Sequence, residues 1–221
     1  MPTSPRNTLL EMFQRLRSVY GPQHWWPADT ATEVVVGAIL TQNTAWTNVE
    51  RAIANLAAAG LLNWADLHRV SPRRLAELIR PSGTYRVKAA RLKAFVDCLW
   101  RDHRGSLKDL LDGDLEAARS RLLSIHGVGP ETADAILLYA GCRPSFVVDA
   151  YTRRVLRRHR LIGPAAGYEA VRQLFHRSIP PDAAAYNEFH ALLVTVGKKH
   201  CRARALCAGC PLADMPHDAE S

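Results

Sequence analysis

Apolar residues recur at helical spacing along almost the whole chain. In the first segment, Leu9, Met12, Phe13 and Leu16 lie three or four positions apart or side by side, which places them on one face of a helix. The same spacing predicts further helices at about 33–40, 49–56, 75–79, 85–100, 115–125, 130–140, 150–159, 168–179 and 182–196. Thr30 is well placed to cap the first of these, and Ser71 with Pro72 opens the helix at 75–79. Only short extended linkers such as 146–148 interrupt this pattern, so we predict an all-α fold.

Residues 124–158 form the most informative segment. A turn of sequence Gly127-Val128-Gly129 joins two predicted helices, and Pro130 suits the first turn of the second one. Glycines let backbone N–H groups approach a ligand closely, and a helix N-terminus favours an anion. We therefore expect this turn to bind a nucleic-acid phosphate. The plainer alternative is a turn that only joins two helices.

Asp149 follows the apolar run 146–148 and precedes a predicted basic helix. A carboxylate beside a phosphate-binding turn repels the DNA backbone, so it is better suited to chemistry than to affinity. Asp149 is also well placed to cap the helix that follows it. Capping alone is the alternative reading, although one carboxylate can serve both purposes.

The composition narrows the class of partner. With 221 residues and 48% hydrophobic side chains, the chain can bury one large core or two modest ones. No apolar stretch reaches the roughly 18 residues of a membrane span, and the N-terminal segment lacks the apolar region of a signal peptide. Twenty-nine Lys and Arg against 21 Asp and Glu give a net charge of +8, which favours a polyanionic partner. We expect a cytoplasmic monomer that binds no membrane.

The Gly127-Val128-Gly129 turn, followed by Thr132-Ala133 and then by Val148-Asp149 before a helix, resembles the helix-hairpin-helix/Gly-Pro-Asp DNA glycosylase superfamily, and within it the endonuclease III group. The resemblance implies two helical domains, residues 23–141 and residues 1–22 with 142–221, and an active site in the cleft between them. It also implies a catalytic role for Asp149 and double-stranded DNA with damaged bases as the partner.

Bifunctional members of the endonuclease III group carry a lysine two residues after the second hairpin glycine, and its amine attacks C1′ to form a Schiff base. This chain has Glu131 at that position, and a carboxylate cannot form an imine. One branch of the group also lacks the lysine and acts on alkylated purines such as 3-methyladenine. The chain resembles this branch at residues 129–137, at the Trp25-Trp26 pair and at residues 34–44.

The sequence therefore predicts a monofunctional DNA glycosylase of base excision repair, without lysine-dependent AP lyase activity, that acts on alkylated purines. Two alternatives stay open. One is an endonuclease III-like glycosylase/AP lyase that acts on oxidised pyrimidines. The other is a non-catalytic protein that binds abasic or distorted DNA.

The resemblance also assigns residues to the flipped base and to the space it leaves. Aromatic side chains hold the base in this branch, which points to Trp25, Trp26 and Trp46, with packing in the core as the alternative. Gln42 matches the residue that fills the space left by the extruded base. Its alternative role is that of a capping or solvated polar residue.

Two groups of basic residues are candidate phosphate contacts, with a solvated charged face as the alternative. Arg86 and Lys88 follow Gly83, where the family has a second, weaker DNA-facing turn. Four arginines lie after Asp149, and at most half of them can face DNA: Arg153, Arg154, Arg157 and Arg158.

Three of the five cysteines gather near the C-terminus: Cys201, Cys207 and Cys210. Their spacing resembles the loop that holds a 4Fe–4S cluster in endonuclease III relatives. The family uses four cysteines, whereas this chain has Pro216 at the fourth position, and His200 and His217 are the alternative ligands. We expect a cluster with a structural role. The alternative is a relic loop with ordinary thiols.

Overall fold

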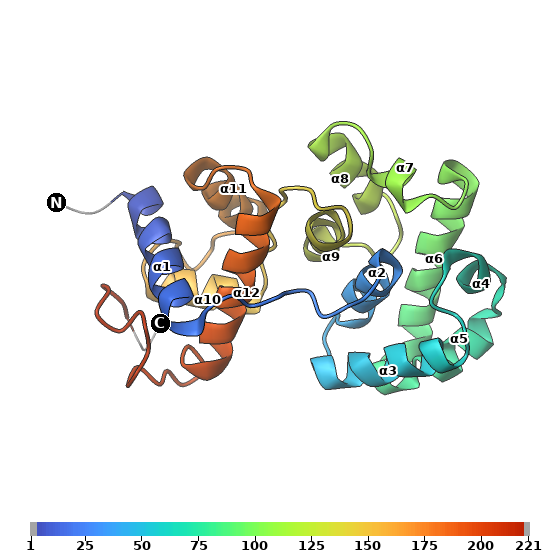
Figure 1. Ribbon diagram of the computed structural model, residues 1–221, viewed down its shortest axis with the longest axis horizontal. Coiled ribbons are helices and arrows are strands. Elements are labelled where there is room, and N and C mark those ends of the chain that lie inside the picture. The colour runs from blue at the N-terminus through green and yellow to red at the C-terminus, as the bar shows by residue number, and fades with distance from the viewer. Residues whose placement is uncertain (1–3, 219–221) are drawn as a thin grey trace. The chain divides into compact units, whose positions relative to one another are not determined.

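The computed structural model describes residues 4–218, and over this range it contains helices and connecting turns but no strand (Figure 1). The prediction of an all-α fold is confirmed. The chain divides into two compact units, one made of the residues up to Trp25 and from Pro144 onward, the other of Trp26–Arg143. None of the described helices combines the length and the apolar character needed to cross a bilayer.

The Trp26–Arg143 unit is built around a buried central helix. Its elements are α2 (Ala31–Leu40), α3 (Trp46–Ala58), α4 (Trp64–Arg69), α5 (Pro72–Leu78), the 3-10 turn η1 (Arg80–Ser82), α6 (Tyr85–His103), α7 (Leu107–Leu111), α8 (Leu115–Leu123), α9 (Pro130–Ala135) and the π-helical turn η2 (Ile136–Ala140). Every residue from Val34 to Leu40 is buried. A helix that is apolar all round belongs in a core, and α2 packs against α3, α6, α9 and η2.

Capping side chains fix where several of these helices begin. Thr30 accepts a hydrogen bond from the N–H of Glu33 at 3.2 Å, and Ser71 accepts one from the N–H of Arg74 at 3.2 Å. Pro72 occupies the first turn of α5, where its missing N–H leaves no bond unmade. The helix starts predicted at Thr30 and Ser71 are confirmed.

The other unit contains α1 (Pro5–Tyr20), α10 (Ala150–Arg158), α11 (Tyr168–Ser178) and α12 (Ala183–Lys199). Helix α12 packs against both α1 and α10. The extended segment before α10 is buried, and its backbone donors are satisfied by side chains: Phe146 donates to His176 Nε2 at 3.2 Å, and Val148 donates to the Tyr168 hydroxyl at 3.3 Å. This anchored segment fixes where α10 starts, and therefore where Asp149 lies.

Candidate functional site

The hairpin turn requires glycine at its first position. Gly127 has a φ of +85°, and a side chain there would also collide with the aliphatic part of Arg91. Val128 is buried, and its N–H donates to the carbonyl of Ile125 at 3.0 Å. Gly129 caps α9 in an extended conformation, and an added Cβ there would meet only open space.

These features refine the predicted phosphate contact. The Val128 amide is engaged within the turn, so the prediction now rests on the amides of Gly127 and Gly129. The open space at Gly129 lets a ligand approach the backbone closely. Glu131 lies exposed in the first turn of α9, at the position of the family's lysine.

Gln42 is held against this turn by three hydrogen bonds. Its Nε2 donates to the Gly127 carbonyl at 3.1 Å and to Thr132 Oγ1 at 2.9 Å, and Arg91 donates to its Oε1. Sequence reasoning missed Arg91, since nothing in the spacing of α6 indicates a partner on another helix. The Gln42 network, formed by Gln42, Arg91, Gly127 and Thr132, joins the end of α2, α6 and the hairpin.

We expect Gln42→Ala to lower the free energy of unfolding by about 1–3 kcal/mol, because the substitution removes the partners of buried polar groups. Duplex binding should weaken as well, because the turn loses a contact that orders it. Urea denaturation and a fluorescence-anisotropy titration measure the two effects. Gln173, an exposed glutamine on α11, provides the matched Gln→Ala control. Equal stability of the two variants would contradict the prediction.

Lys88 does not lie on the surface, as its predicted role requires. Its side chain is 1% exposed, and its Nζ donates to the carbonyls of Leu40 at 2.8 Å and Ser82 at 2.5 Å. Burial, and secondly the charge of Arg91, lower the pKa of Lys88. The predicted phosphate contact is therefore wrong for Lys88, which instead binds the last carbonyl of α2. Arg86 is exposed and stays a candidate contact.

Trp26 lies within an aromatic cluster. Its ring centroid is 5.0 Å from that of Trp46, edge to face, and 5.1 Å from that of Tyr139. Gly37 of α2 allows the approach, because a Cβ there would come within 3.2 Å of Trp26 and 3.5 Å of Trp46. Trp26, Trp46 and Tyr139 are each only partly buried. Sequence reasoning missed Tyr139, which lies on the π-helical turn η2, a distortion that often occurs at functional sites.

Trp25 belongs to the other unit, where the ammonium of Lys198 lies 5.9 Å from the centre of its ring. The two adjacent tryptophans therefore have different surroundings. A role for Trp25 in holding a base stays a prediction.

Asp149 caps α10, as predicted. Its Oδ1 accepts a hydrogen bond from the N–H of Thr152 at 2.7 Å, and its Oδ2 lies 3.7 Å from Nε2 of His190. The side chain is 15% exposed, while that of His190 is 5% exposed. One carboxylate oxygen is thus fixed by the helix, and the carboxylate still reaches solvent.

The arginines that follow Asp149 mostly bind their own unit. Arg153 donates to the Ala166 carbonyl, and Arg154 donates to that of Cys201. Arg158 is 4% exposed. Only Arg157 of the four is exposed, so these residues add less to a DNA-binding surface than their number implies.

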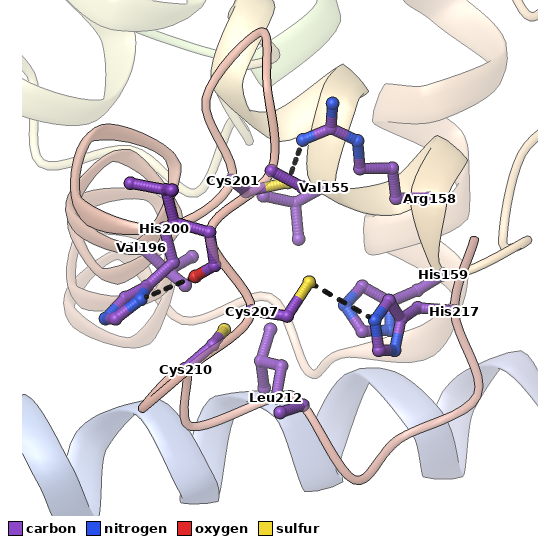
Figure 2. Close-up of a pocket in the computed structure, with 13 residues that line it drawn as sticks. Val155, Arg158, His159, Val196, His200, Cys201, Cys207, Cys210, Leu212 and His217 are labelled. Atoms are coloured by element: carbon purple, nitrogen blue, oxygen red, sulfur yellow. Dashed lines mark hydrogen bonds between the residues drawn. The ribbon is translucent and has the colours of Figure 1, made fainter. Parts of the chain in front are cut away.

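The C-terminal loop places Cys201, Cys207 and Cys210 around a small pocket of about 30 Å³ (Figure 2). Arg158 Nη1 donates to Cys201 Sγ at 3.2 Å, and Cys207 Sγ lies 3.5 Å from Nε2 of His217. Burial, and secondly the neighbouring thiols, raise the pKa of Cys210 despite a backbone hydrogen bond that lowers it.

This loop does not present the ligand set of a four-cysteine cluster. Pro216 occupies the fourth position, and across residues 4–218 no group of three His, Cys, Asp or Glu side chains is arranged to hold a metal ion. His200 Nδ1 bonds instead to the carbonyl of Leu206 at 3.0 Å. The 4Fe–4S cluster therefore stays a prediction from the sequence, and no chemistry is assigned to it.

Known proteins resemble this chain over most of its length. Residues 36–181 match the family described as HhH-GPD superfamily base excision DNA repair protein. MJ1434, an inferred DNA repair glycosylase of Methanocaldococcus jannaschii, is 47% identical over 209 residues, which is 94% of each chain. Endonuclease III of Thermotoga maritima is 27% identical over 80% of this chain and 78% of its own.

A solved structure agrees with these matches. The H. pylori 3-methyladenine DNA glycosylase MagIII, bound to 1,N6-ethenoadenine, superposes with a TM-score of 0.76 and is 27% identical. The superposition covers 89% of this chain and 98% of MagIII.

Proposed function

Because the chain belongs to the HhH-GPD superfamily of base excision DNA repair glycosylases, we propose that it is a monofunctional enzyme that hydrolyses the N-glycosidic bond of alkylated purines such as 3-methyladenine. The observation that carries the proposal is an accessible, helix-capping carboxylate at Asp149 in a chain that has a glutamate, Glu131, where the family has its lysine.

The reaction breaks the bond between C1′ and the base nitrogen and forms a bond between C1′ and a water oxygen. Positive charge builds on the sugar as the base leaves. The Asp149 carboxylate stabilises this charge and orients the water, whose proton passes to solvent. The departing base takes the electron pair of the broken bond.

Glu131 supports hydrolysis without a covalent intermediate. An imine forms only from an amine nucleophile, and Glu131 carries a carboxylate in place of an amine. The product is then an intact strand with an abasic site, which alkali breaks afterwards. Strand cleavage belongs to a later step outside this enzyme.

The aromatic cluster of Trp26, Trp46 and Tyr139 supports a cationic, planar substrate. A 3-methyladenine nucleotide carries a positive charge, and a cation over an indole face gains about 0.5–2 kcal/mol, the more so once water is excluded. Its base is already an activated leaving group, so no strong general acid is needed. The similarity to a 3-methyladenine DNA glycosylase also supports this substrate.

Incubation with a duplex that contains 3-methyladenine should release the free base, and strand breaks should form only after alkali. Borohydride added during turnover should trap no covalent protein–DNA adduct, because no imine forms. Chromatography of the base, a denaturing gel and a trapping gel read these outcomes. Strand breaks without alkali, or a trapped adduct, would overturn the monofunctional assignment.

The second candidate is an endonuclease III-like enzyme for oxidised pyrimidines, which the similarity to endonuclease III of T. maritima favours. A parallel duplex with an oxidised pyrimidine separates the two. Release from that duplex alone would select the second candidate, and binding without release from either would select a non-catalytic DNA-binding protein.

A further inference from the structure

A buried histidine that the sequence did not single out lies beside Asp149. His190 lies on α12, 4% exposed, and its Nε2 points at the carboxylate oxygen that the helix cap leaves open, at 3.7 Å. The opposite oxygen is held by Thr152 at 2.7 Å. The two ends of the carboxylate therefore face two different elements, the first turn of α10 and the buried face of α12.

The ring of His190 is buried among aromatic side chains. It lies edge-on to Phe146, with 6.4 Å between the centroids, and Phe146 stacks on Phe175 at 3.5 Å. Phe189, which precedes His190 on α12, packs edge-on against Phe175. An imidazole fixed in this way restricts the rotation of the carboxylate that it faces.

We propose that His190 is a positioning residue for Asp149: its Nε2–H orients Oδ2 of the carboxylate toward the reacting sugar without itself contacting DNA. This inference rests on the proposed function, in which Asp149 stabilises the charged sugar. It adds to that function a residue on which the geometry of the carboxylate depends.

The protonation state of His190 agrees with this role. Burial lowers the pKa of His190, and the nearby charge of Asp149 offsets that effect only in part. The imidazole is therefore neutral at pH 7. A neutral N–H dipole holds the carboxylate but does not cancel its charge, whereas an imidazolium would neutralise the charge that the transition state needs.

The test compares single-turnover base release with duplex affinity in His190→Leu and His190→Gln. We expect His190→Leu to slow release by about 10–100-fold, the cost of a small misplacement of a catalytic group, while the duplex Kd is unchanged. His190→Gln should recover most of the rate, because its side-chain amide supplies an N–H at a similar reach. If His190→Leu does not fold, His190→Asn, whose amide is shorter, replaces it and should also slow release.

Two further variants separate a positioning role of His190 from a general effect on packing. Leu192→Val changes another fully buried side chain of the same helix and should leave the rate close to wild type. In an Asp149→Asn background, His190→Leu should add nothing, because the two residues act as one unit. An equal additional loss in that background, or an equal loss in Leu192→Val, would overturn the positioning role. Full activity of Asp149→Asn alone would instead refute the proposed function.

Discussion

Substitution of Asp149 by asparagine should slow the release of a damaged base by at least about 10²–10³-fold, the usual cost of losing one preorganised group that stabilises transition-state charge. The loss should appear in the single-turnover rate. Affinity for the duplex should stay the same or increase, because a negative charge near the DNA backbone is removed. Single-turnover release of 3-methyladenine and an anisotropy titration measure the two quantities.

This substitution is a precise test because asparagine keeps the structural role of Asp149. Asparagine and aspartate are equally good N-caps, so the amide oxygen can still accept the hydrogen bond from Thr152. Helix α10 should therefore begin at the same residue, and the melting temperature should change little. The substitution removes the charge and one carboxylate oxygen while the cap is kept, so a loss of rate can be attributed to the carboxylate and not to the fold.

Asp182 provides the matched control. It caps α12 in the same unit, where its Oδ1 accepts a hydrogen bond from the N–H of Ala185 at 2.6 Å. Asp182→Asn makes the same chemical change at another cap and should leave the rate of release unaltered. If both variants lose activity equally, the effect lies in the caps or in net charge, and Asp149 has no special role.

The parts of this structure that the sequence predicted are those decided by local interactions. The capping roles of Thr30, Ser71 and Asp149 involve partners three residues away, and proline at the start of α5 acts through its own ring. Helices α4 and α7 were not predicted, because six and five residues are too few to show a clear period.

Residues whose partners are distant in sequence could not be assigned in the same way. The sequence predicts a phosphate contact for Lys88, although its ammonium binds the carbonyl of Leu40, 48 positions away. Arg91 contacts Gln42 across 49 positions, and His190 faces Asp149 from another helix. A sequence shows that these side chains carry hydrogen-bond donors, but it does not show which acceptors the donors reach. Lys88, Arg91 and His190, which lie near the candidate site, are all residues of this kind.

The hairpin contains such a long-range pair, and disrupting it should have the largest effect on stability. Arg119 of α8 and Asp134 of α9 form a two-pronged ion pair, with Nε–Oδ1 at 2.8 Å and Nη2–Oδ2 at 3.1 Å. Their side chains are 8% and 0% exposed, and the pair joins the two helices that flank the Gly127–Gly129 turn. At this depth, water cannot solvate the charge that remains when one member of the pair is removed.

Asp134→Ala should lower the free energy of unfolding by about 3–5 kcal/mol, because it removes the buried carboxylate that accepts two hydrogen bonds from the guanidinium of Arg119. That is a large part of the roughly 5–15 kcal/mol that stabilises a typical domain. Urea denaturation followed by circular dichroism gives the value. Duplex affinity should fall in parallel, because the Gly127–Gly129 turn loses the ion pair that holds its two flanking helices together.

A double variant separates charge from packing. Arg119→Met with Asp134→Leu removes both charges and keeps apolar volume, so it should recover most of the stability that Asp134→Ala loses.

The exposed pair of Arg15 and Glu11, at 2.8 Å, is the surface counterpart, and Glu11→Ala should lower the free energy of unfolding by no more than about 1 kcal/mol. If Asp134→Ala costs no more than Glu11→Ala, the hairpin is held by its apolar contacts and the buried pair is dispensable. If the double variant is as unstable as the single one, shape rather than charge decides how the two helices pack.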